Sequence, residues 1–477
     1  MSEAVVRPAA GHTSARPDLL ASLDPLLRAW LPRQRWFAGK GRPVTGFSLV
    51  AVTELLPAGL LHVLIRAEQP AVAESPPAAD CYQLFLGIRR TLPPHLAAAL
   101  IGHADTGPLA GSAVYEGLQD PRLASLLLER LRAPGRSGVL RFERAEGVEL
   151  PGGLMPRTLG AEQSNSSLVY GDTYILKLFR RVTPGLNPDL ELPLLLAREG
   201  SGRVPAPVAW FGAEPDGQFL SGLAGAESEE TMTLGVLQPF LAGAEDGWEL
   251  ALRSLAKGDD FRTEAHALGR ATAEVHAALA AAAPTVSLGP QQRELIADGM
   301  LERLRATAQD VPMLRPYVRS LAAAFDEVRR LPESDALFAQ RVHGDLHLGQ
   351  CLRPADGAWN IIDFEGEPAR PLPERRRPQP AVRDVAGMLR SFDYAGRSHR
   401  PWAPAWAAGC RAAYCEGYVA GGGTDPSVHP ALLRAYETDK AVYEVLYEAR
   451  HRPDWLAVPM AAIRRLAGEA DEHPEDN

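Results

Sequence analysis

Hydrophobic positions along the first ninety residues follow one helical pattern and then three strand-like patterns. Apolar side chains near residues 19–30 recur at the spacing of an amphipathic helix. The Pro- and Ala-containing residues 69–80 and the glycine-bounded residues 102–111 predict loops. Together these patterns predict an N-terminal cap subdomain over residues 1–90. Its strands are expected at residues 47–56, 60–66 and 82–88.

A strand-rich region comes next, and a helical region follows it. Gly171 and Asp172 separate two apolar runs and predict a hairpin turn. We therefore predict a β-rich lobe over residues 91–240 and a mainly helical lobe over residues 241–477, an α+β and bilobal architecture. The β-rich lobe should contain strands at 139–144, 166–170 and 174–179. The helical lobe should contain helices at 263–280, 292–306, 313–331, 383–394 and 432–450.

Composition narrows the kind of partner. The chain has 477 residues, and 50 Lys and Arg against 59 Asp and Glu give a net charge of -9, which argues against a nucleic-acid partner. No apolar run is long enough to cross a bilayer, and the first residues lack the apolar core of a signal peptide. The four cysteines show no paired CxxC spacing. We expect a cytoplasmic protein with reduced thiols that acts on a small ligand.

Two polar stretches late in the chain contain the densest candidate chemistry, RVHGDLHLGQ at 341–350 and WNIIDFEGE at 359–367. Transfer of a phosphoryl group to a hydroxyl needs a carboxylate near the attacking oxygen and oxygen ligands for Mg²⁺. Asp345 is the predicted carboxylate for the hydroxyl proton, and Gln350 and Asp363 are the predicted metal ligands. This interpretation requires Asp345 and Asp363 to lie close together in the fold.

The same residues admit two other interpretations. His343, Asp345 and His347 alternate as ligands of a metal-dependent hydrolase can, and Asp363 could complete the set. Such a site needs further histidines at fixed offsets, and none stands out. In a purely structural interpretation, His343 and Asp345 only hydrogen-bond a turn. The nearby Asp363 makes phosphoryl transfer the preferred interpretation.

A lysine inside an apolar strand is the candidate for binding nucleotide phosphates. Lys177 lies within residues 174–179, where a charge is costly unless it has a partner. The expected partner is Glu191, with Asp189 as the second choice. The alternative is a lysine that points outward and pairs at the surface.

Two further segments are predicted to contact the nucleotide. Residues 162–167 precede the hairpin and contain no glycine, but they stand where kinases cover the phosphates with backbone N–H groups. Residues 234–239 are apolar and then turn, so Val236 and Gln238 are predicted to offer backbone groups to the adenine edge. A plain buried strand accounts for this second pattern as well. The residues predicted to cover the phosphates are Ser164, Asn165 and Ser166.

At this point the chain resembles a known family, the aminoglycoside-phosphotransferase-like kinases with their protein-kinase-like fold, and within it the bacterial maltokinases. The similarity covers most of the chain. Its more specific parts are the QRWFAGKG stretch and the C-terminal helix, whereas HGD and DFEGE are shared in altered form with wider kinase groups. The matching stretches are QRWFAGKG at 34–41, EQSNSSL at 162–168, LKLFRRVTPG at 176–185, HGDLHLGQ at 343–350, IDFEGEP at 362–368 and YETDKAVYE at 436–444.

The resemblance implies a bilobal kinase with an N-terminal cap that uses ATP and Mg²⁺ to convert maltose into maltose 1-phosphate and ADP. That product would feed glycogen and α-glucan synthesis from trehalose-derived maltose, with a trehalose-maltose isomerase as an implied partner. Gln350 stands where most members of the larger class have Asn. Both amides supply an oxygen for Mg²⁺, but that of Gln has the longer reach.

A sugar site needs hydrogen-bonding groups and aromatic faces near the catalytic carboxylate. Lys440, Tyr443 and Tyr447 fall on one face of the last long helix together with Tyr436. A tyrosine stripe is also typical of a helix packed into a core, but the lysine within it favours a ligand site. The predicted sugar contacts are His343, Glu365, Lys440, Tyr443 and Tyr447.

Two other functions stay open at this point. A kinase of the same fold for another small acceptor, such as glucosamine, fits the nucleotide-binding residues equally well, because those residues do not contact the sugar. A non-catalytic nucleotide-binding regulator of a glucan enzyme is the third hypothesis. The presence of Asp345, Asp363 and Lys177 argues against it.

Overall fold

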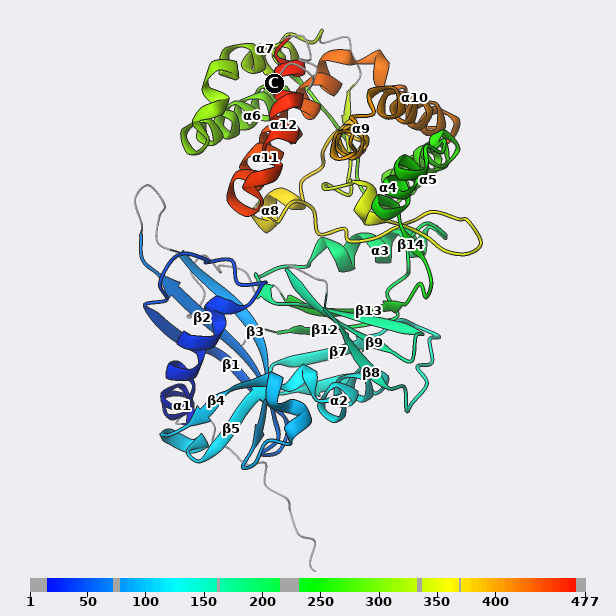
Figure 1. Cartoon of the computed structure of the whole chain (residues 1–477). Coiled ribbons are helices and arrows are strands. Elements are labelled where there is room, and N and C mark those ends of the chain that lie inside the picture. Colours follow the sequence, from blue (N-terminus) through cyan, green and yellow to red (C-terminus); the bar gives the residue numbers. More distant parts are fainter. Residues whose placement is uncertain are drawn as a thin grey trace, which may run out of the picture. The chain divides into compact units, whose positions relative to one another are not determined.

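The chain forms two units in the computed structural model (Figure 1). The first unit comprises Met1–Leu190 and Pro207–Phe240, and the second comprises Glu191–Ala206 and Leu241–Asn477. The chain therefore leaves the first unit, returns to it for two strands, and then completes the second. The structure describes residues 15–71, 78–160, 164–214, 231–332, 337–368 and 370–468.

Two antiparallel sheets form the first unit. The first sheet has the order β1-β2-β3-β5-β4, with β11 also paired to β3, and the second has the order β6-β7-β12-β13-β10-β9-β8. The strands of the first sheet are β1 (Gly46–Leu56), β2 (Leu60–Gln69), β3 (Ala78–Arg89), β4 (Leu100–Ala104), β5 (Ser112–Glu116) and β11 (Arg181–Val182). Those of the second are β6 (Gly135–Ser137), β7 (Leu140–Arg144), β8 (Pro156–Leu159), β9 (Asn165–Tyr170), β10 (Tyr174–Phe179), β12 (Ala209–Ala213) and β13 (Met232–Pro239).

The amphipathic N-terminal segment is helix α1 (Ala15–Trp30), which packs on β1 and β4 of the first sheet (Figure 1). Its apolar face is fully buried at Leu23 and Leu27. Burial of this face against the sheet is what stabilises so short a helix, because an isolated helix of this length is marginal in water. The predicted helix and the three strands after it are confirmed.

The loop predicted at 102–111 is only partly a loop. Its first residues belong to β4, which pairs with β5 and has a register shift between Leu100 and Gly102. A Cβ atom at Gly102 would lie 2.7 Å from Leu26 Cδ2 of α1. Glycine here permits a close approach between helix and strand, whereas the sequence pattern suggested a turn. Helix α2 (Pro121–Arg132) follows this sheet.

The predicted hairpin of the second sheet is confirmed. Thr173 N donates to Tyr170 O at 3.0 Å, and Gly171 and Asp172 between them have φ values of 55° and 51°. Glycine and aspartate tolerate this left-handed conformation better than most residues do. The turn thereby joins β9 to β10, the strand that contains Lys177.

The two sheets of the first unit are connected through Gln83, a fully buried residue of β3. Its Nε2 donates to Phe179 O at the end of β10 and to Leu234 O of β13, each at 2.9 Å. Since both donor bonds come from Nε2, the amide oxygen Oε1 is the acceptor for His62 Nε2 at 2.8 Å. His62 therefore carries its proton on Nε2, which leaves Nδ1 as a bare acceptor in a fully buried site.

We expect His62 to make the stability of the first unit depend on pH. Burial lowers the pKa of His62 from 6.5 to about 4, although the bond to Gln83 opposes part of this shift. Between these values the unfolded state binds a proton that the folded state does not, so stability falls as the pH falls from 6.5 to about 4. The loss is at most about 3 kcal/mol.

His62→Phe tests this expectation, because phenylalanine keeps an aromatic ring but does not titrate. The variant leaves the Gln83 oxygen without its partner and should be less stable at every pH. Urea unfolding from pH 7 to pH 4 should nevertheless show a flatter pH dependence than in the wild type. Equal slopes in the two proteins would contradict the assignment.

Helices dominate the second unit, where α9 packs against α10, α11 and α12, and α10 packs against α5 (Figure 1). Short strands of this unit form two small sheets, one with the order β14-β17-β18 and one that pairs β15 with β16. The helices are α4 (Gly247–Lys257), α5 (Arg262–Ala282), α6 (Pro290–Asp310), α7 (Val318–Arg329), α8 (Leu372–Arg375), α9 (Val382–Ser398), α10 (Pro404–Ala420), α11 (Pro430–His451) and α12 (Ala457–Leu466), after α3 (Pro188–Arg198), which runs from the first unit into the second. The strands are β14 (Glu245–Asp246), β15 (Val286–Ser287), β16 (Phe338–Ala339), β17 (Cys351–Arg353) and β18 (Asn360–Ile361).

The apolar stripe predicted on α9 is core, as Val385, Met388, Leu389 and Phe392 are all buried. The five helices predicted for this region exist, although the one expected at 313–331 begins as a 3-10 turn before α7. Within the described ranges, no helix has both the length and the apolar character needed to cross a membrane.

The subdomain boundaries stay predictions. The first sheet continues past residue 90 to Glu116, at the end of β5, and the first unit ends at Phe240.

Candidate active site

Lys177 lies on β10 of the first unit and is paired with a buried acid. Its Nζ lies 2.8 Å from Asp189 Oδ2, and the lysine side chain is only 15% exposed. It also lies 5.6 Å from the centre of the Phe179 ring. The carboxylate offsets the cost of burying a charge in an apolar strand. The alternative of a lysine that points outward is therefore wrong.

Glu191, the first choice as the partner of Lys177, belongs to the second unit. Its two carboxylate oxygens accept hydrogen bonds from Arg341 at 2.8 and 2.9 Å, the bidentate geometry favoured by arginine. The prediction is corrected accordingly: the acid paired with Lys177 is Asp189, and Glu191 anchors Arg341 at the start of the HGD stretch. Residues two apart on a helix do not face the same way, which explains the exchange.

The segment predicted to cover the phosphates enters the same sheet as Lys177. Ser164 is exposed and precedes β9, whereas Asn165 and Ser166 are its first residues. Ser167 is the register partner of Lys177 across the hairpin. The predicted segment thus begins beside the strand that contains Lys177, and its binding of phosphates stays a prediction. The preceding residues 162 and 163 lie outside the described ranges.

The predicted adenine contact at Val236 is wrong. Val236 is buried in β13, where it is the register partner of Lys177 on β10 and of Trp210 on β12. A residue paired on both sides of a sheet has its backbone groups engaged in the ladder. Gln238 is half-buried near the end of β13, and its role stays a prediction.

A buried carboxylate that sequence reasoning missed holds the loop bearing Asp345. Asp384 on α9 accepts hydrogen bonds from the backbone N–H groups of His343 and Gly344, at 2.7 and 2.8 Å, and from His276 Nε2 at 3.0 Å. Burial raises the pKa of Asp384, but the hydrogen bond and charge of His276 outweigh it, so the pKa lies below its ordinary value. A charged residue beside an apolar helical stripe was the available signal.

His343 contacts both polar stretches, 341–350 and 359–367. It is 2% exposed, and its ring lies 4.7 Å from that of Phe364. Its Nε2 donates to Ile362 O at 2.9 Å, so Nδ1 is the acceptor for Asp345 N at 3.3 Å. Both ring nitrogens are therefore used by the backbone. The predicted sugar contact of His343 is wrong for this reason, and the metal-hydrolase alternative loses the same ligand.

The two predicted metal ligands flank the hairpin of β17 and β18 and meet at its open end. Ile362 N donates to Gln350 O, and Gln350 Nε2 donates to Asp363 Oδ2, both at 2.9 Å. Asp363 has a φ of 65°, a left-handed conformation that aspartate tolerates better than most non-glycine residues. The pair offers carboxylate and amide oxygens, which are the ligands that Mg²⁺ prefers.

Asp345 and Asp363 both interact electrostatically with His347. Burial lowers the pKa of His347, and both carboxylates oppose that shift. A Cβ atom at Gly344 would lie 3.4 Å from Gly366 Cα, so the two polar stretches run close together. This proximity of the two stretches agrees with the phosphoryl-transfer interpretation, and the meeting of the two carboxylates stays a prediction.

Lys440 of α11 forms an ion pair with Asp345. Its Nζ lies 2.5 Å from Asp345 Oδ1, 3.9 Å from Glu367 and 4.7 Å from the centre of the Tyr443 ring. Burial lowers the pKa of Lys440, but the charges of Asp345 and Glu367 raise it above its ordinary value, so this lysine is cationic. Tyr443 stacks on Tyr447 with ring centres 6.2 Å apart. The helix thus brings Lys440 to Asp345, with Tyr443 beside the lysine and Tyr447 stacked on Tyr443, and the contact of these residues with a sugar stays a prediction.

The carboxylates that line the small cavity beside Lys440 form ion pairs with basic residues of the same unit. Asp439 binds Arg303 at 2.8 Å, and Glu367 binds Arg370 and Arg383. Burial raises the pKa of Glu367, but the arginine charges and Lys440 lower it to about 2. Sequence reasoning missed this ion-pair cluster. The described lining of the cavity consists of Gly344, Asp345, Leu346, Glu367, Arg383, Asp384, Gly387, Tyr436, Asp439 and Lys440.

Glu365, the remaining predicted sugar contact, is half-buried, and its carbonyl oxygen accepts from Arg375 at 2.9 Å. Its contact with a sugar stays a prediction. Tyr436 is buried in the core, whereas Tyr443 and Tyr447 are half-buried.

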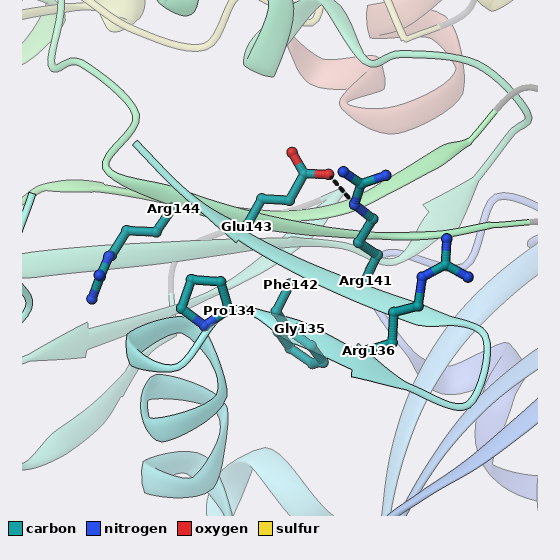
Figure 2. Close-up of a pocket in the computed structure, with 7 residues that line it drawn as sticks. All are labelled: Pro134, Gly135, Arg136, Arg141, Phe142, Glu143 and Arg144. Atoms are coloured by element: carbon teal, nitrogen blue, oxygen red, sulfur yellow. Dashed lines mark ion pairs between the residues drawn. The ribbon is translucent and has the colours of Figure 1, made fainter. Parts of the chain in front are cut away.

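A wider surface hollow of about 560 Å³ lies on the edge hairpin of β6 and β7 in the first unit (Figure 2). Two of its arginines are neutralised locally, because Arg141 binds Glu143 at 2.7 Å and Glu214 at 2.8 Å, and Arg136 also binds Glu214. Arg144 donates to the backbone oxygen of Arg132 at 2.9 Å. Strands β12 and β13 separate β7 from β10. The hollow is therefore remote from Lys177 within this unit and does not contribute to the predicted site.

Comparison with known proteins identifies the class of enzyme that this fold and these residues define. Residues 154–426, more than half of the chain, match the model of the phosphotransferase enzyme family, and residues 30–120 match that of the maltokinase N-terminal cap domain. The chain belongs to the phosphotransferase enzyme family, with a kinase-like fold and an N-terminal cap domain.

Two curated relatives are glucosamine kinases. The protein from Streptacidiphilus jiangxiensis is 31% identical over 342 residues, covering 66% of this chain and 74% of the relative. The protein from Mycolicibacterium smegmatis is 30% identical over 334 residues, covering 66% of this chain and 80% of the relative.

Solved structures of a glucosamine kinase share the fold. One, in complex with glucosamine, ADP and inorganic phosphate, has a TM-score of 0.61 and 24% identity and covers 93% of this chain and 98% of its own. A second crystal form has a TM-score of 0.64 at the same identity and covers 93% of this chain and 99% of its own.

Proposed function

We propose that this chain is an ATP-dependent kinase of a neutral sugar, converting maltose and ATP into maltose 1-phosphate and ADP. The observation that carries the proposal is the ion pair between Asp345, within the residues that match the phosphotransferase family, and Lys440 of the helix that follows them, in a chain that also has a maltokinase-type cap. In the proposed reaction, Asp345 accepts the proton of the attacking hydroxyl, and Lys177 contacts the nucleotide phosphates. Tyr443 and Tyr447 offer aromatic faces to the sugar.

Gln350 and Asp363 are the proposed ligands of Mg²⁺. Their side chains meet at the open end of one hairpin, where Gln350 Nε2 donates to Asp363 Oδ2, and a hard cation suits the carboxylate and amide oxygens that the two residues offer. The bound ion supplies charge neutralisation for the transferred phosphoryl group. The hydrogen bond between the two side chains holds Gln350 and Asp363 next to each other.

Charge around Asp345 supports a neutral acceptor over an amino sugar. The carboxylates beside Lys440 already have cationic or histidine partners among the described residues. An ammonium group approaching Asp345 would meet the charge of Lys440, and two such charges 4 Å apart repel by about 4 kcal/mol at an effective dielectric constant of 20. Maltose has no charge and avoids this repulsion.

Lys440→Met tests the charge argument. Removal of the cation should raise the ratio of kcat/KM for glucosamine to that for maltose by about tenfold or more, whatever the loss in absolute rate. Lys257→Met, at an exposed residue of α4, is the matched control and should leave the ratio unchanged. An unchanged ratio in the Lys440 variant would remove this argument for a neutral acceptor.

A panel of acceptors tests the proposal as a whole. ADP release should be measured with maltose, glucose, glucosamine and aminoglycosides, and maltose should give the highest kcat/KM. Activity confined to an amino sugar would overturn the choice of maltose and support a glucosamine kinase, the second candidate, which the two curated relatives favour. Nucleotide binding without turnover on any sugar would favour the regulatory hypothesis.

The maltose proposal also assigns a position in metabolism. Maltose 1-phosphate is an activated sugar suited to glycogen and α-glucan synthesis, and an enzyme that makes maltose from trehalose is the proposed supplier. Both assignments depend on the outcome of the acceptor panel.

A further inference from the structure

A line of three buried polar side chains lies behind the loop that bears Asp345, and the proposed mechanism assigns no role to two of them. Tyr418 belongs to α10, His276 to α5 and Asp384 to α9, and their exposed fractions are 3%, 4% and 1%. Burying polar groups in a helical core is costly unless each one finds a hydrogen-bond partner. The partners of these residues therefore indicate what the line does.

Each member of the line bonds to the next, and the last one bonds to the loop. The Tyr418 hydroxyl lies 2.8 Å from His276 Nδ1, and His276 Nε2 lies 3.0 Å from Asp384 Oδ2. Asp384 then accepts from the backbone N–H groups of His343 at Oδ2 and of Gly344 at Oδ1. Both carboxylate oxygens are thereby engaged. The line thus runs from α10 through α5 and α9 to the loop that carries the candidate catalytic carboxylate.

The chemistry of the groups determines which nitrogen of His276 serves Asp384. A carboxylate only accepts hydrogen bonds, so Nε2 is the donor. Burial, together with the charge of Asp384, raises the pKa of Tyr418, so its phenol keeps its proton. In the neutral imidazole, Nδ1 accepts from this O–H group, and in the charged ring it donates to the phenol oxygen. In either form Tyr418 satisfies Nδ1 and leaves Nε2 to donate to Asp384.

The backbone that Asp384 holds has a conformation that favours glycine. Gly344 has a φ of 85°, in the left-handed region. Its N–H group donates to Asp384 at 2.8 Å, and its carbonyl oxygen accepts from Arg383 Nη2 at 3.0 Å. The first turn of α9 thus holds both sides of this residue. Because Asp345 follows directly, the conformation of Gly344 sets the direction in which the chain enters Asp345.

Close packing of α10 on α5 keeps Tyr418 within hydrogen-bonding reach of His276. A Cβ atom at Gly417, the residue before Tyr418, would lie 1.9 Å from His266 O of α5, so only glycine permits this approach. A larger residue there would push the two helices apart. The phenol is therefore held in place by the packing of two helices that contain no residue of the proposed mechanism.

We propose that His276 and Tyr418 are positioning residues that fix the orientation of the Asp384 carboxylate and, through it, the loop that presents Asp345 to the acceptor hydroxyl. The inference rests on the proposed role of Asp345 as the base. Neither residue contacts the acceptor or the nucleotide in this scheme, so their loss slows the transfer step and leaves substrate binding intact. Helices α5 and α10 then support catalysis, although they supply none of the reacting groups.

Two tyrosines of α10 provide a matched comparison. Tyr418→Phe removes the hydroxyl that bonds to His276. Tyr414→Phe, one helical turn earlier, is the control, because Tyr414 is also buried and donates to Thr272 Oγ1 of α5 at 3.0 Å. Both variants should lower the melting temperature by a similar amount. Only Tyr418→Phe should lower kcat on the best acceptor of the panel, by roughly fivefold, with KM for ATP and for the sugar unchanged.

Replacements of His276 separate positioning from packing. His276→Phe keeps an aromatic ring but removes the donor to Asp384, and kcat should fall by about ten- to a hundredfold. His276→Gln lacks the ring but offers an amide N–H group in place of Nε2–H, and it should restore most of the lost kcat. A residue that only filled space would give the opposite order of the two variants.

Asp345→Asn, measured alongside, separates the inference from the proposed function. If this variant is impaired, equal kcat values in the Tyr418→Phe and Tyr414→Phe proteins overturn the inference alone. No recovery of kcat in His276→Gln relative to His276→Phe has the same meaning. Wild-type turnover by the Asp345→Asn protein overturns the proposed role of Asp345 and the inference together.

Discussion

Asp345→Asn should lower kcat by about 10²- to 10⁴-fold, the usual contribution of a positioned general base. Asparagine keeps the size of the side chain and an oxygen that can accept from Lys440 Nζ, which lies 2.5 Å away. It cannot accept a proton from an attacking hydroxyl. KM for ATP should change little, because Asp345 is assigned to the acceptor and not to the nucleotide.

Asparagine is a sharper replacement than alanine at this position. Asp345→Ala would leave the buried Lys440 cation with only the more distant Glu367, at 3.9 Å, and would mix a loss of stability with the loss of catalysis. Asp356→Asn in an exposed turn of the same unit is the matched control and should have wild-type kinetics. Wild-type turnover by the Asp345→Asn protein, with its melting temperature unchanged, would refute the catalytic assignment.

Arg390→Met should reduce the free energy of unfolding by about 3–5 kcal/mol, the cost of leaving a buried charge without its partner. Arg390 is 1% exposed in α9 and binds Glu444 of α11 at 2.6 Å and Asp393 at 3.4 Å. Burial raises the pKa of Glu444, and the charge of Arg390 opposes the shift. Without the arginine, Glu444 must lose its charge or pull α11 out of place.

Two comparisons make the Arg390 prediction specific. Arg450→Met removes a cation from the same helix as Glu444, but Arg450 and its partner Asp310 are 59% and 49% exposed, so the loss should be about 0–1 kcal/mol. Adding Glu444→Gln to Arg390→Met should recover part of the lost stability, since no charge is then stranded. Urea unfolding of the four proteins measures both effects, and equal losses for the Arg390 and Arg450 variants would show that the buried pair is not special.

The ion pairs of Arg390 with Glu444 and Asp393 should also affect the proposed sugar site. Glu444 follows Tyr443 on α11 and lies one turn beyond Lys440, so the buried pair fixes the helix that presents both side chains. Loss of Arg390 should therefore raise KM for the sugar as well as lower stability.

Local patterns were sufficient for the elements and for much of the second unit. The hairpin at Gly171 and Asp172, the apolar stripe of α9 and the closeness of the two polar stretches all follow from short-range spacing. The two polar stretches are separated by one hairpin, so their closeness depends on few long-range contacts. The phosphotransferase class followed from the same residues together with the family resemblance.

Predictions failed where a partner lay far away in the sequence. The choice between Asp189 and Glu191 depends on which side of α3 faces Lys177 and which faces Arg341, a residue 150 positions from Glu191. His343 carried the pattern of a ligand, yet Ile362 O and Asp345 N use both of its nitrogens. The sequence around Val236 has the pattern of a segment that connects two lobes, but in the structure Val236 is paired with β10 on one side and with β12 on the other.

The amino-acid sequence alone determined which segments become helices and strands and which short stretches contain the candidate catalytic residues, because periodicity and turn residues act over a few neighbours. Only the tertiary structure decided which charges pair: Lys177 with Asp189, Lys440 with Asp345, and Arg390 with Glu444. Pairing of buried charges depends on packing between elements that are distant in sequence, and the high cost of an unpaired buried charge makes that packing decisive.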